Sequence, residues 1–219
     1  PQTFAVMQTR AKSLGINILE APRSEWSFTE DVYGCLLQYP DANGEAEDLE
    51  SLVESAHSAD VKVVMATDLM ALLMLKSPGE MGADVVVGSS QRFGVPMGYG
   101  GPHAAFFAAD ESYKRHFPGR IIGVSVDRHG NPALRMALQT REQHIRRDKA
   151  TSNICTAQAL LAVMASMYAV YHGPKGLRSI AERIHCRTKS FATALNSNTS
   201  MDVVNSCYFD TLKIKVKGG

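Results

Sequence analysis

The stretch Gly88-Ser-Ser-Gln-Arg-Phe-Gly-Val-Pro-Met-Gly-Tyr-Gly-Gly-Pro-His103 decides how the rest of the sequence is interpreted. Its glycines and prolines exclude a helix or a regular strand. Apolar runs lie on both sides of it, at 83–88 and 103–108, and both are predicted to be buried strands. A glycine-rich elbow between two strands has two interpretations. It lets the strands pack closely, or it brings the backbone against a cofactor or a partner subunit.

Upstream of the elbow, strand-like and helix-like segments alternate. Leu49, Leu52, Val53 and Ala56 recur at helical spacing and predict a helix. The elements predicted before the elbow are strands at 3–8, 36–39 and 61–66, a helix over 44–59 and a short helical piece at 69–76. This alternation predicts an α/β fold with a mainly parallel sheet.

Downstream of Asp110 the pattern turns helical. Residues 155–172 are apolar nearly all round, which predicts a buried helix that Gly173-Pro174 ends. A second, amphipathic helix is predicted over 175–195, followed by a strand-like run at 209–216. We therefore expect a partial large α/β domain over 1–172, and over 173–219 a helix and the truncated start of a smaller α+β domain. Because Pro1 is no initiator and the chain stops just after a predicted strand, we expect an internal fragment.

Composition excludes several classes of function. A net charge of +1 gives no sign of nucleic-acid binding, and no apolar run approaches the roughly 20 residues that span a bilayer. The four cysteines form no Cys-x-x-Cys pair, which argues against a zinc site or a disulfide scaffold. Neither G-x-G-x-x-G nor the P-loop pattern occurs, and no catalytic triad can be argued. No metal ligands and no catalytic residues are predicted.

The second informative segment is 139–155, Gln-Thr-Arg-Glu-Gln-His-Ile-Arg-Arg-Asp-Lys-Ala-Thr-Ser-Asn-Ile-Cys. One interpretation is a solvated charged surface followed by the start of a helix. The other is that Thr151, Ser152 and Asn153 bind an anion such as phosphate, where helix amides point outward. Arg146, Arg147 and Lys149 would reinforce that positive field. The residues alone leave both interpretations open.

Two long motifs, 89–107 and 137–161, resemble the glycine decarboxylase P-protein family of the glycine cleavage system. Shorter pieces agree with it, among them Leu37-Gln-Tyr-Pro40, Tyr171-His-Gly173 and Phe209-Asp-Thr-Leu-Lys213. The resemblance covers nearly the whole chain. It implies a pyridoxal-phosphate (PLP) enzyme of the aspartate-aminotransferase-like fold (fold type I), with a large sheet domain and a smaller C-terminal domain.

The resemblance also implies which half of the family's long form this chain matches. Only the second half carries the PLP lysine, in a His-Lys dipeptide before its elbow, and here that dipeptide reads Gln91-Arg92. Arginine stays protonated and cannot form the Schiff base. For the acid that pairs with the pyridinium nitrogen, ungapped counting gives Met65, with Asp68 close by. The chain therefore resembles the first half, which has the fold without the covalent anchor.

In this fold, active sites form between two subunits or halves. The resemblance thus assigns Thr151, Ser152 and Asn153 to cofactor binding, at the phosphate of the partner's PLP, and the elbow residues 99–103 to the same interface. The partners implied are the lysine-bearing half, in the same chain or a separate subunit, lipoylated H-protein and glycine, in a homodimer or heterotetramer. No nucleic acid or membrane is expected.

The activity implied for the intact enzyme is decarboxylation of glycine and transfer of the aminomethyl group to the lipoyl arm of H-protein. The compartment implied is the mitochondrial matrix in a eukaryote and the cytoplasm in a bacterium. Two alternatives stay open. One is a self-sufficient PLP enzyme that uses another lysine, with Lys149 the best candidate, and the other is a non-catalytic dimerisation module.

Overall fold

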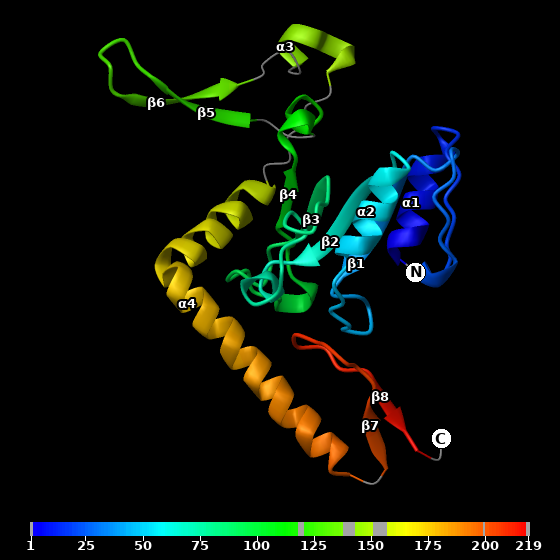
Figure 1. Cartoon of the computed structure of the whole chain (residues 1–219). Coiled ribbons are helices and arrows are strands. Elements are labelled where there is room, and N and C mark those ends of the chain that lie inside the picture. Colours follow the sequence, from blue (N-terminus) through cyan, green and yellow to red (C-terminus); the bar gives the residue numbers. More distant parts are fainter. Residues whose placement is uncertain (1, 118–120, 138–142, 151–156, 199, 218–219) are drawn as a thin grey trace.

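A computed structural model describes residues 2–117, 121–137, 143–150, 157–198 and 200–217. The helices and strands in chain order are α1 (Gln2–Lys12), β1 (Gly34–Tyr39), α2 (Glu50–Ser58), β2 (Lys62–Asp68), β3 (Val85–Ser89), β4 (Ala105–Ala109), β5 (Ile121–Val126), β6 (Pro132–Ala137), α3 (Gln143–Arg146), α4 (Ala157–Asn196), β7 (Met201–Val203) and β8 (Ile214–Val216). Short 3₁₀ turns lie between them at Arg23–Glu25, Ala71–Leu73, Gly98–Gly100, Glu111–Arg115 and Arg147–Lys149. Figure 1 shows the large sheet at the centre, the β5–β6 hairpin beyond one end of it and β7–β8 beyond the other.

The central sheet has the strand order β1-β2-β3-β4. Its first three strands are parallel, with Leu36 opposite Val64 and Val64 opposite Val85, and β4 pairs antiparallel with β3. The prediction of a mainly parallel α/β sheet is confirmed, and the four predicted strands that form it lie within two residues of their predicted starts. These apolar, β-branched runs form strands because both of their faces are covered.

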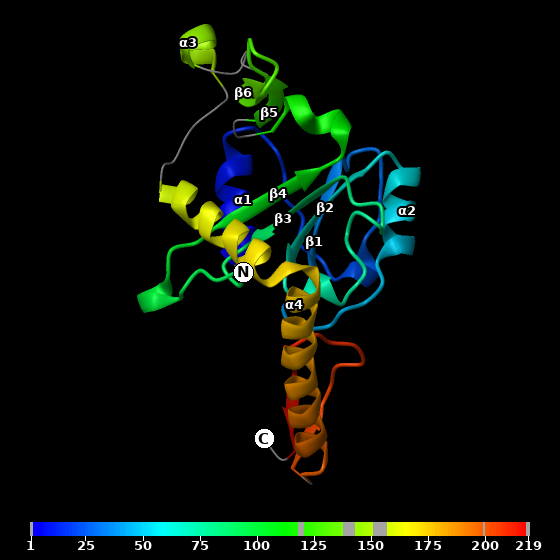
Figure 2. The same cartoon turned by 90° about the vertical axis from the view of Figure 1, so that its left-hand side faces the viewer.

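Helices cover the sheet on both faces (Figure 2). On one face Val53 and Ala56 of α2 pack with Leu37, Val63 and Met65 of β1 and β2 in one buried cluster. On the other face, α4 contributes Leu161 and Ala181 to two smaller clusters. The predicted face of α2 is thus the one that is buried. The methionines predicted as core, Met65, Met70 and Met81, are at most 2% exposed, whereas Met74 is partly exposed.

Helix α4 bends where the sequence predicts a stop. Gly173 has φ 60° and ψ 176°, and Pro174 follows it, so two helical segments meet at a kink. A positive φ is the region that glycine adopts at little cost, and proline cannot continue the preceding ladder of hydrogen bonds. Beyond the kink, α4 runs away from the sheet toward β7 and β8 (Figure 1). The division into domains over 1–172 and 173–219 stays a prediction.

The prediction of a strand at 3–8 was wrong, since these residues lie in α1. A short apolar run fits either element by periodicity alone. The neighbouring Gln8, Arg10 and Lys12 favour a helix, and Ala11 is the buried residue of α1. Helix α2 also begins later than predicted, at Glu50, because residues before it pair with the C-terminal part of the chain, where Ala46 N donates to Cys207 O.

The region after Asp110 is not purely helical, because β5 and β6 form an antiparallel hairpin there. The β-branched run 121–126 and a turn explain it. The Asp127 carboxylate accepts hydrogen bonds from the backbone amides of His129 and Asn131, and Gly130 has φ 84°. The predicted strand at 209–216 is likewise shorter, since only Ile214–Val216 pairs, with Met201–Val203.

The first part of α4 is not buried as its composition predicts. Leu161 and Ala165 are buried, but Leu160, Val163, Met167, Val170 and Tyr171 are exposed by 54–86%. These five side chains recur at helical spacing on the side away from the sheet, and no other described segment covers them. The amphipathic prediction for 175–195 is confirmed for Leu177 and Ala181, while Phe191 is exposed.

Candidate functional site

A cleft of about 380 Å³ lies at the carboxyl ends of the parallel strands. This edge is where open α/β sheets bind their ligands, because loops from neighbouring strands diverge there. Its walls come from the ends of β1 and β2, from the start of the elbow after β3 and from the C-terminal segment. The lining residues are Gln38, Pro40, Asp41, Gly44, Thr67, Asp68, Ala71, Ser89, Gln91, Arg92, Phe209, Asp210 and Thr211.

Arg92 is the cation among these lining residues, and two carboxylates hold it. One terminal nitrogen lies 2.6 Å from Asp68 Oδ2 and the other 2.7 Å from Asp210 Oδ2. The guanidinium carbon lies 5.5 Å from the centre of the Phe209 ring. A guanidinium can donate to two carboxylates while its plane stacks on a ring, so Arg92 uses the features that distinguish arginine from lysine.

In strand β2, Asp68 lines the cleft, whereas Met65, which ungapped counting gave, does not. Met65 is fully buried in the core below α2. Asp68 ends β2, and its second carboxylate oxygen accepts a hydrogen bond of 3.2 Å from Met70 N. Because successive side chains along a strand point to opposite faces, an odd shift of three residues changes the face. The ungapped count therefore points to a side chain on the face opposite Asp68, and the pairing of any acid with the pyridinium nitrogen stays a prediction.

The C-terminal segment 205–211 forms the outer wall of the cleft. Glu45 holds it, since its carboxylate accepts hydrogen bonds from the Ser206 hydroxyl at 2.5 Å and the Cys207 amide at 2.8 Å. The Ser206 hydroxyl is the main cause that lowers the pKa of Glu45 below its ordinary value, and the backbone amides of Cys207 and Ser206 add to it. These hydrogen bonds therefore favour the ionised form of Glu45, and the ionised carboxylate in turn stabilises the attachment of the segment 205–211.

Replacement of Glu45 by glutamine tests this attachment. A lowered pKa in the folded state means that the stability contributed is present above the ordinary pKa and is lost as the pH falls below about 4. We expect Glu45→Gln to lower the melting temperature at pH 7 by about 3 °C. We also expect the variant to lose part of the decline in melting temperature that the wild type shows between pH 5 and pH 3.

Glu54→Gln is the matched control, because Glu54 is exposed on α2. Thermal unfolding followed by circular dichroism at several pH values measures both effects. Equal pH profiles for Glu45→Gln and wild type would contradict the assignment.

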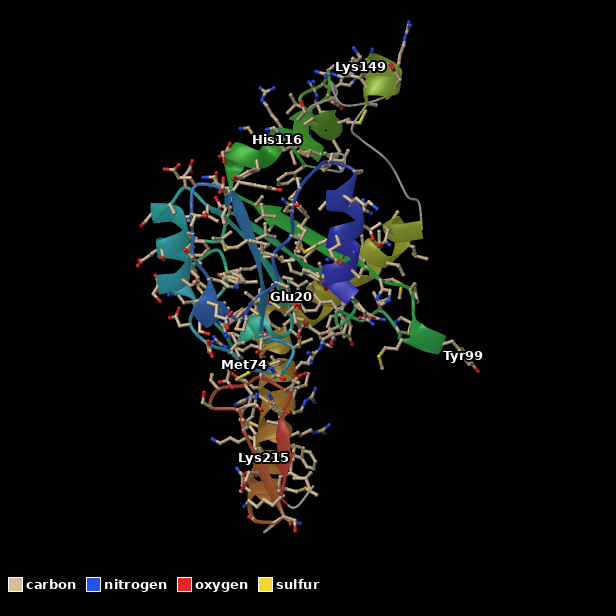
Figure 3. All side chains as sticks on the ribbon, turned by 90° about the vertical axis from the view of Figure 1, so that its right-hand side faces the viewer. Glu20, Met74, Tyr99, His116, Lys149 and Lys215 are labelled. Carbon is tan, nitrogen blue, oxygen red and sulfur yellow. The ribbon has the colours of Figure 1, made fainter. Side chains whose placement is uncertain are left out.

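The glycine elbow packs against α4 and also reaches into solvent. Gly94 has φ 81°, and a Cβ there would lie 2.7 Å from the Tyr168 ring, so the elbow passes close to α4. Val95 is buried with Leu161. Farther along, Tyr99 is fully exposed and projects from the body of the molecule (Figure 3). The first part of the elbow thus packs against α4, and the interface role of 99–103 stays a prediction.

The residues predicted to bind the cofactor, Thr151, Ser152 and Asn153, lie outside the described residues. The basic residues just before them, Arg146, Arg147 and Lys149, are exposed. Figure 3 shows Lys149 at the α3 end of the molecule, far from Met74 and the C-terminal segment. Lys149 is therefore not a lining residue of the cleft.

Asp210 and Phe209 are the cleft residues whose role sequence reasoning missed. The sequence signals them only as part of a family-like motif, because their role depends on a tertiary contact with Arg92. Within the described ranges, no group of three or more His, Cys, Asp or Glu side chains could hold a metal ion. The described helices include none that is long and apolar enough to cross a membrane.

The cleft does not fit a covalently bound PLP. Its lining contains no lysine, and Arg92, which the family resemblance puts in the lysine's place, is paired with Asp68 and Asp210. A Schiff base needs a deprotonated amine, which arginine does not supply. The fold is thus that of the PLP-dependent transferase class (fold type I), and the described lining of its cleft holds no residue that could anchor PLP covalently.

The chain belongs to the P-protein family of the glycine cleavage system, whose model matches residues 1–218. It is 60% identical over 216 residues to "glycine dehydrogenase (decarboxylating) 1, mitochondrial" of Arabidopsis thaliana, covering 98% of this chain and 21% of that protein. It is 58% identical over 217 residues to glycine dehydrogenase (decarboxylating) of Aliivibrio salmonicida, covering 99% and 22%. The chain thus spans about one fifth of the length of the curated relatives that it matches.

Solved structures confirm the fold. A crystal structure of a glycine decarboxylase P-protein, in inhibitor-bound form, superposes with a TM-score of 0.86 at 35% identity, over 95% of this chain and 49% of that one. A sphingosine-1-phosphate lyase of Burkholderia pseudomallei gives a TM-score of 0.53 at 14% identity, over 85% of this chain and 40% of that one. A cysteine desulfurase of Escherichia coli gives 0.52 at 12%, over 87% and 45%. These last two show the fold alone.

Proposed function

We propose that this chain is the lysine-free part of a glycine decarboxylase of the glycine cleavage system, and that it completes an active site with the lysine-bearing half. The observation that carries the proposal is Arg92, in the place of the Schiff-base lysine and paired with Asp68 and Asp210. A protein with this segment decarboxylates glycine only if another part of it supplies the lysine. The complementary half, in the same chain or a separate subunit, is therefore the first partner.

Two exposed apolar surfaces support association with such a partner. We call the first the α4 face, made of Leu160, Val163, Met167, Val170 and Tyr171. The second is the hairpin face. In an antiparallel pair, opposite residues point to the same side, so Val124 and Leu134 lie together, as do Val126 and Pro132, next to Ile122. Neighbouring exposed apolar side chains of this kind are typical of interaction sites.

The proposed role of this chain at the shared site is to bind and position. Thr151, Ser152 and Asn153 would hold the phosphate of the cofactor that the lysine-bearing half anchors. That cofactor supplies the electron sink for loss of carbon dioxide from glycine. The proposed acceptor is the lipoyl arm of H-protein. The proposed assembly is a homodimer or heterotetramer, in the mitochondrial matrix if the source is a eukaryote and in the cytoplasm if it is a bacterium.

The test is coexpression of this chain with the lysine-bearing half, followed by borohydride reduction, peptide mapping and an assay of carbon dioxide release from glycine with lipoylated H-protein. We expect activity only when both parts are present and a PLP adduct only outside this chain. We also expect Ser152→Ala and Asn153→Ala to weaken PLP retention.

Two results would overturn the proposal. A trapped adduct on Lys149 or another lysine of this chain would make it a self-sufficient PLP enzyme. Full activity of the lysine-bearing half without this chain would reduce it to a dimerisation module. The exposed position of Lys149, away from the cleft, argues against the first result.

A further inference from the structure

Arg92 joins three parts of the chain that are far apart in sequence. Asp68 ends β2, Arg92 follows β3 at the start of the elbow, and Asp210 belongs to the loop between β7 and β8. This loop, residues 204–213, leaves the small β7–β8 sheet and returns to it. In Figure 1 it reaches from that small sheet toward the end of the large one. Both carboxylates that pair with Arg92 are about a quarter exposed, so the contact is partly shielded from water.

We propose that Arg92 is a latch that fixes the loop 204–213 on the large sheet, in a cleft whose described lining does not fit a covalently bound PLP. The loop carries Phe209, which is 2% exposed and packs with Met70, Ala71 and Ala181. The guanidinium lies over the same ring. The latch thus acts on the segment whose Phe209 side chain packs between the turn after β2 and α4.

The latch has a second attachment point on the same loop. Glu45 binds Ser206 and Cys207, and the Asn205 side-chain amide donates to Asn43 O at 2.9 Å. On the α4 side, His185 Nδ1 lies 2.8 Å from Phe209 O. The loop is therefore held by β2, by the elbow, by residues 43–45 and by the second part of α4. Fixing it sets where α4 and the β7–β8 sheet lie relative to the large sheet.

Latch and covalent cofactor exclude one another in this cleft. The acid beside a Schiff-base lysine must be available to the cofactor. Here the Asp68 carboxylate is already in an ion pair with Arg92. A lysine at position 92 could place one ammonium between the two acids, but it could not donate from two nitrogens and stack on Phe209 together. Arg92 is therefore a positioning residue, which holds the loop 204–213 in place.

Hydrogen–deuterium exchange of the protein, read on peptides within 204–213, tests the latch. We expect Arg92→Lys to increase exchange there by roughly tenfold, because local opening costs less when the two ion pairs and the stacking are weakened. Peptides of β2 and α2 should keep their wild-type rates. Arg23→Lys is the matched control, since Arg23 pairs with Glu47 at 2.7 Å on the surface and has a similar exposure. It should leave 204–213 unchanged.

Asp210→Asn provides a second variant that leaves the core side chains in place. It should increase exchange of the same loop. Adding it to Arg92→Lys should produce little further change, because both substitutions disrupt the same contact between Arg92 and Asp210. Unchanged exchange of 204–213 in both variants would overturn the proposal. So would a uniform increase over the whole chain, which would assign Arg92 to general stability. Neither readout depends on PLP or on the lysine-bearing half, so the latch and the proposed function fail separately.

Discussion

Replacing Gly88 by alanine is expected to destabilise the protein by about 3 kcal/mol, the largest single-residue effect on its folding that we predict. Gly88 lies in β3, paired with Thr67 of β2 and Phe106 of β4. A Cβ at this position would lie 2.1 Å from the Thr67 carbonyl oxygen and 2.6 Å from Cε1 of Phe106. The phenylalanine ring can turn away, but the carbonyl oxygen belongs to the neighbouring parallel strand.

The strain would therefore separate β2 from β3 at the end that carries the cleft. Asp68 follows Thr67, and Arg92 follows β3 by a few residues, so the Arg92–Asp68 ion pair lies beside the disturbance. We expect lower soluble yield and faster exchange of the loop 204–213 as well as a lower free energy of unfolding. Urea unfolding at 25 °C measures the main effect.

Gly79→Ala is the control for the same chemical change. A Cβ at Gly79 meets nothing within 4 Å, and its φ is not positive. Its effect should stay within about 0.5 kcal/mol, as is usual for exposed positions. If Gly88→Ala unfolds at the same urea concentration as Gly79→Ala, the close approach of β3 to Thr67 is wrong.

The sheet was predictable because its strands are continuous apolar runs separated by strong breakers. Runs such as 61–66 and 83–88 have to be buried on both faces, and only a sheet covered by helices achieves this. The kink of α4 was predictable for a local reason too, because Gly173-Pro174 allows few backbone conformations. Where the local signal is weak, as in the short apolar run at 3–8, the pattern predicted a strand although these residues form part of helix α1.

The cleft was only half predictable. The family resemblance puts Gln91-Arg92 in the place of a His-Lys dipeptide, which predicts that this cleft has no covalent anchor. What Arg92 does instead depends on Asp210, which a loop between two later strands brings to it. No periodicity or spacing encodes such a contact. The exposed α4 face shows the same limit, since an apolar composition indicates that a surface is covered but not which chain covers it.

A charge on the hairpin face is expected to prevent association with the lysine-bearing half, if that half covers this face as we propose. Val124 is 81% exposed in this chain and lies opposite Leu134, which is 75% exposed. Burying a valine in an interface contributes roughly 1.5 kcal/mol or more. Burying an unpaired carboxylate there costs several kcal/mol. We therefore expect Val124→Asp to weaken association by more than about 100-fold.

The fold of the variant itself should be unaffected, because the side chain that is changed makes little contact within this chain. Ser125→Asp is the matched control, since Ser125 is the next residue of β5 and points to the opposite side of the hairpin. Both variants carry the same added charge. Sedimentation velocity of each chain mixed with the lysine-bearing half measures the dissociation constants.

The comparison between the two variants decides the result. Loss of the complex with Val124→Asp, and its retention with Ser125→Asp, would place the partner on the hairpin face. Equal weakening by both would mean that the added charge acts at long range, and raising the salt concentration would then restore binding to both. Unchanged association of both variants would remove the hairpin from the interface and leave the α4 face as the proposed contact surface for the lysine-bearing half.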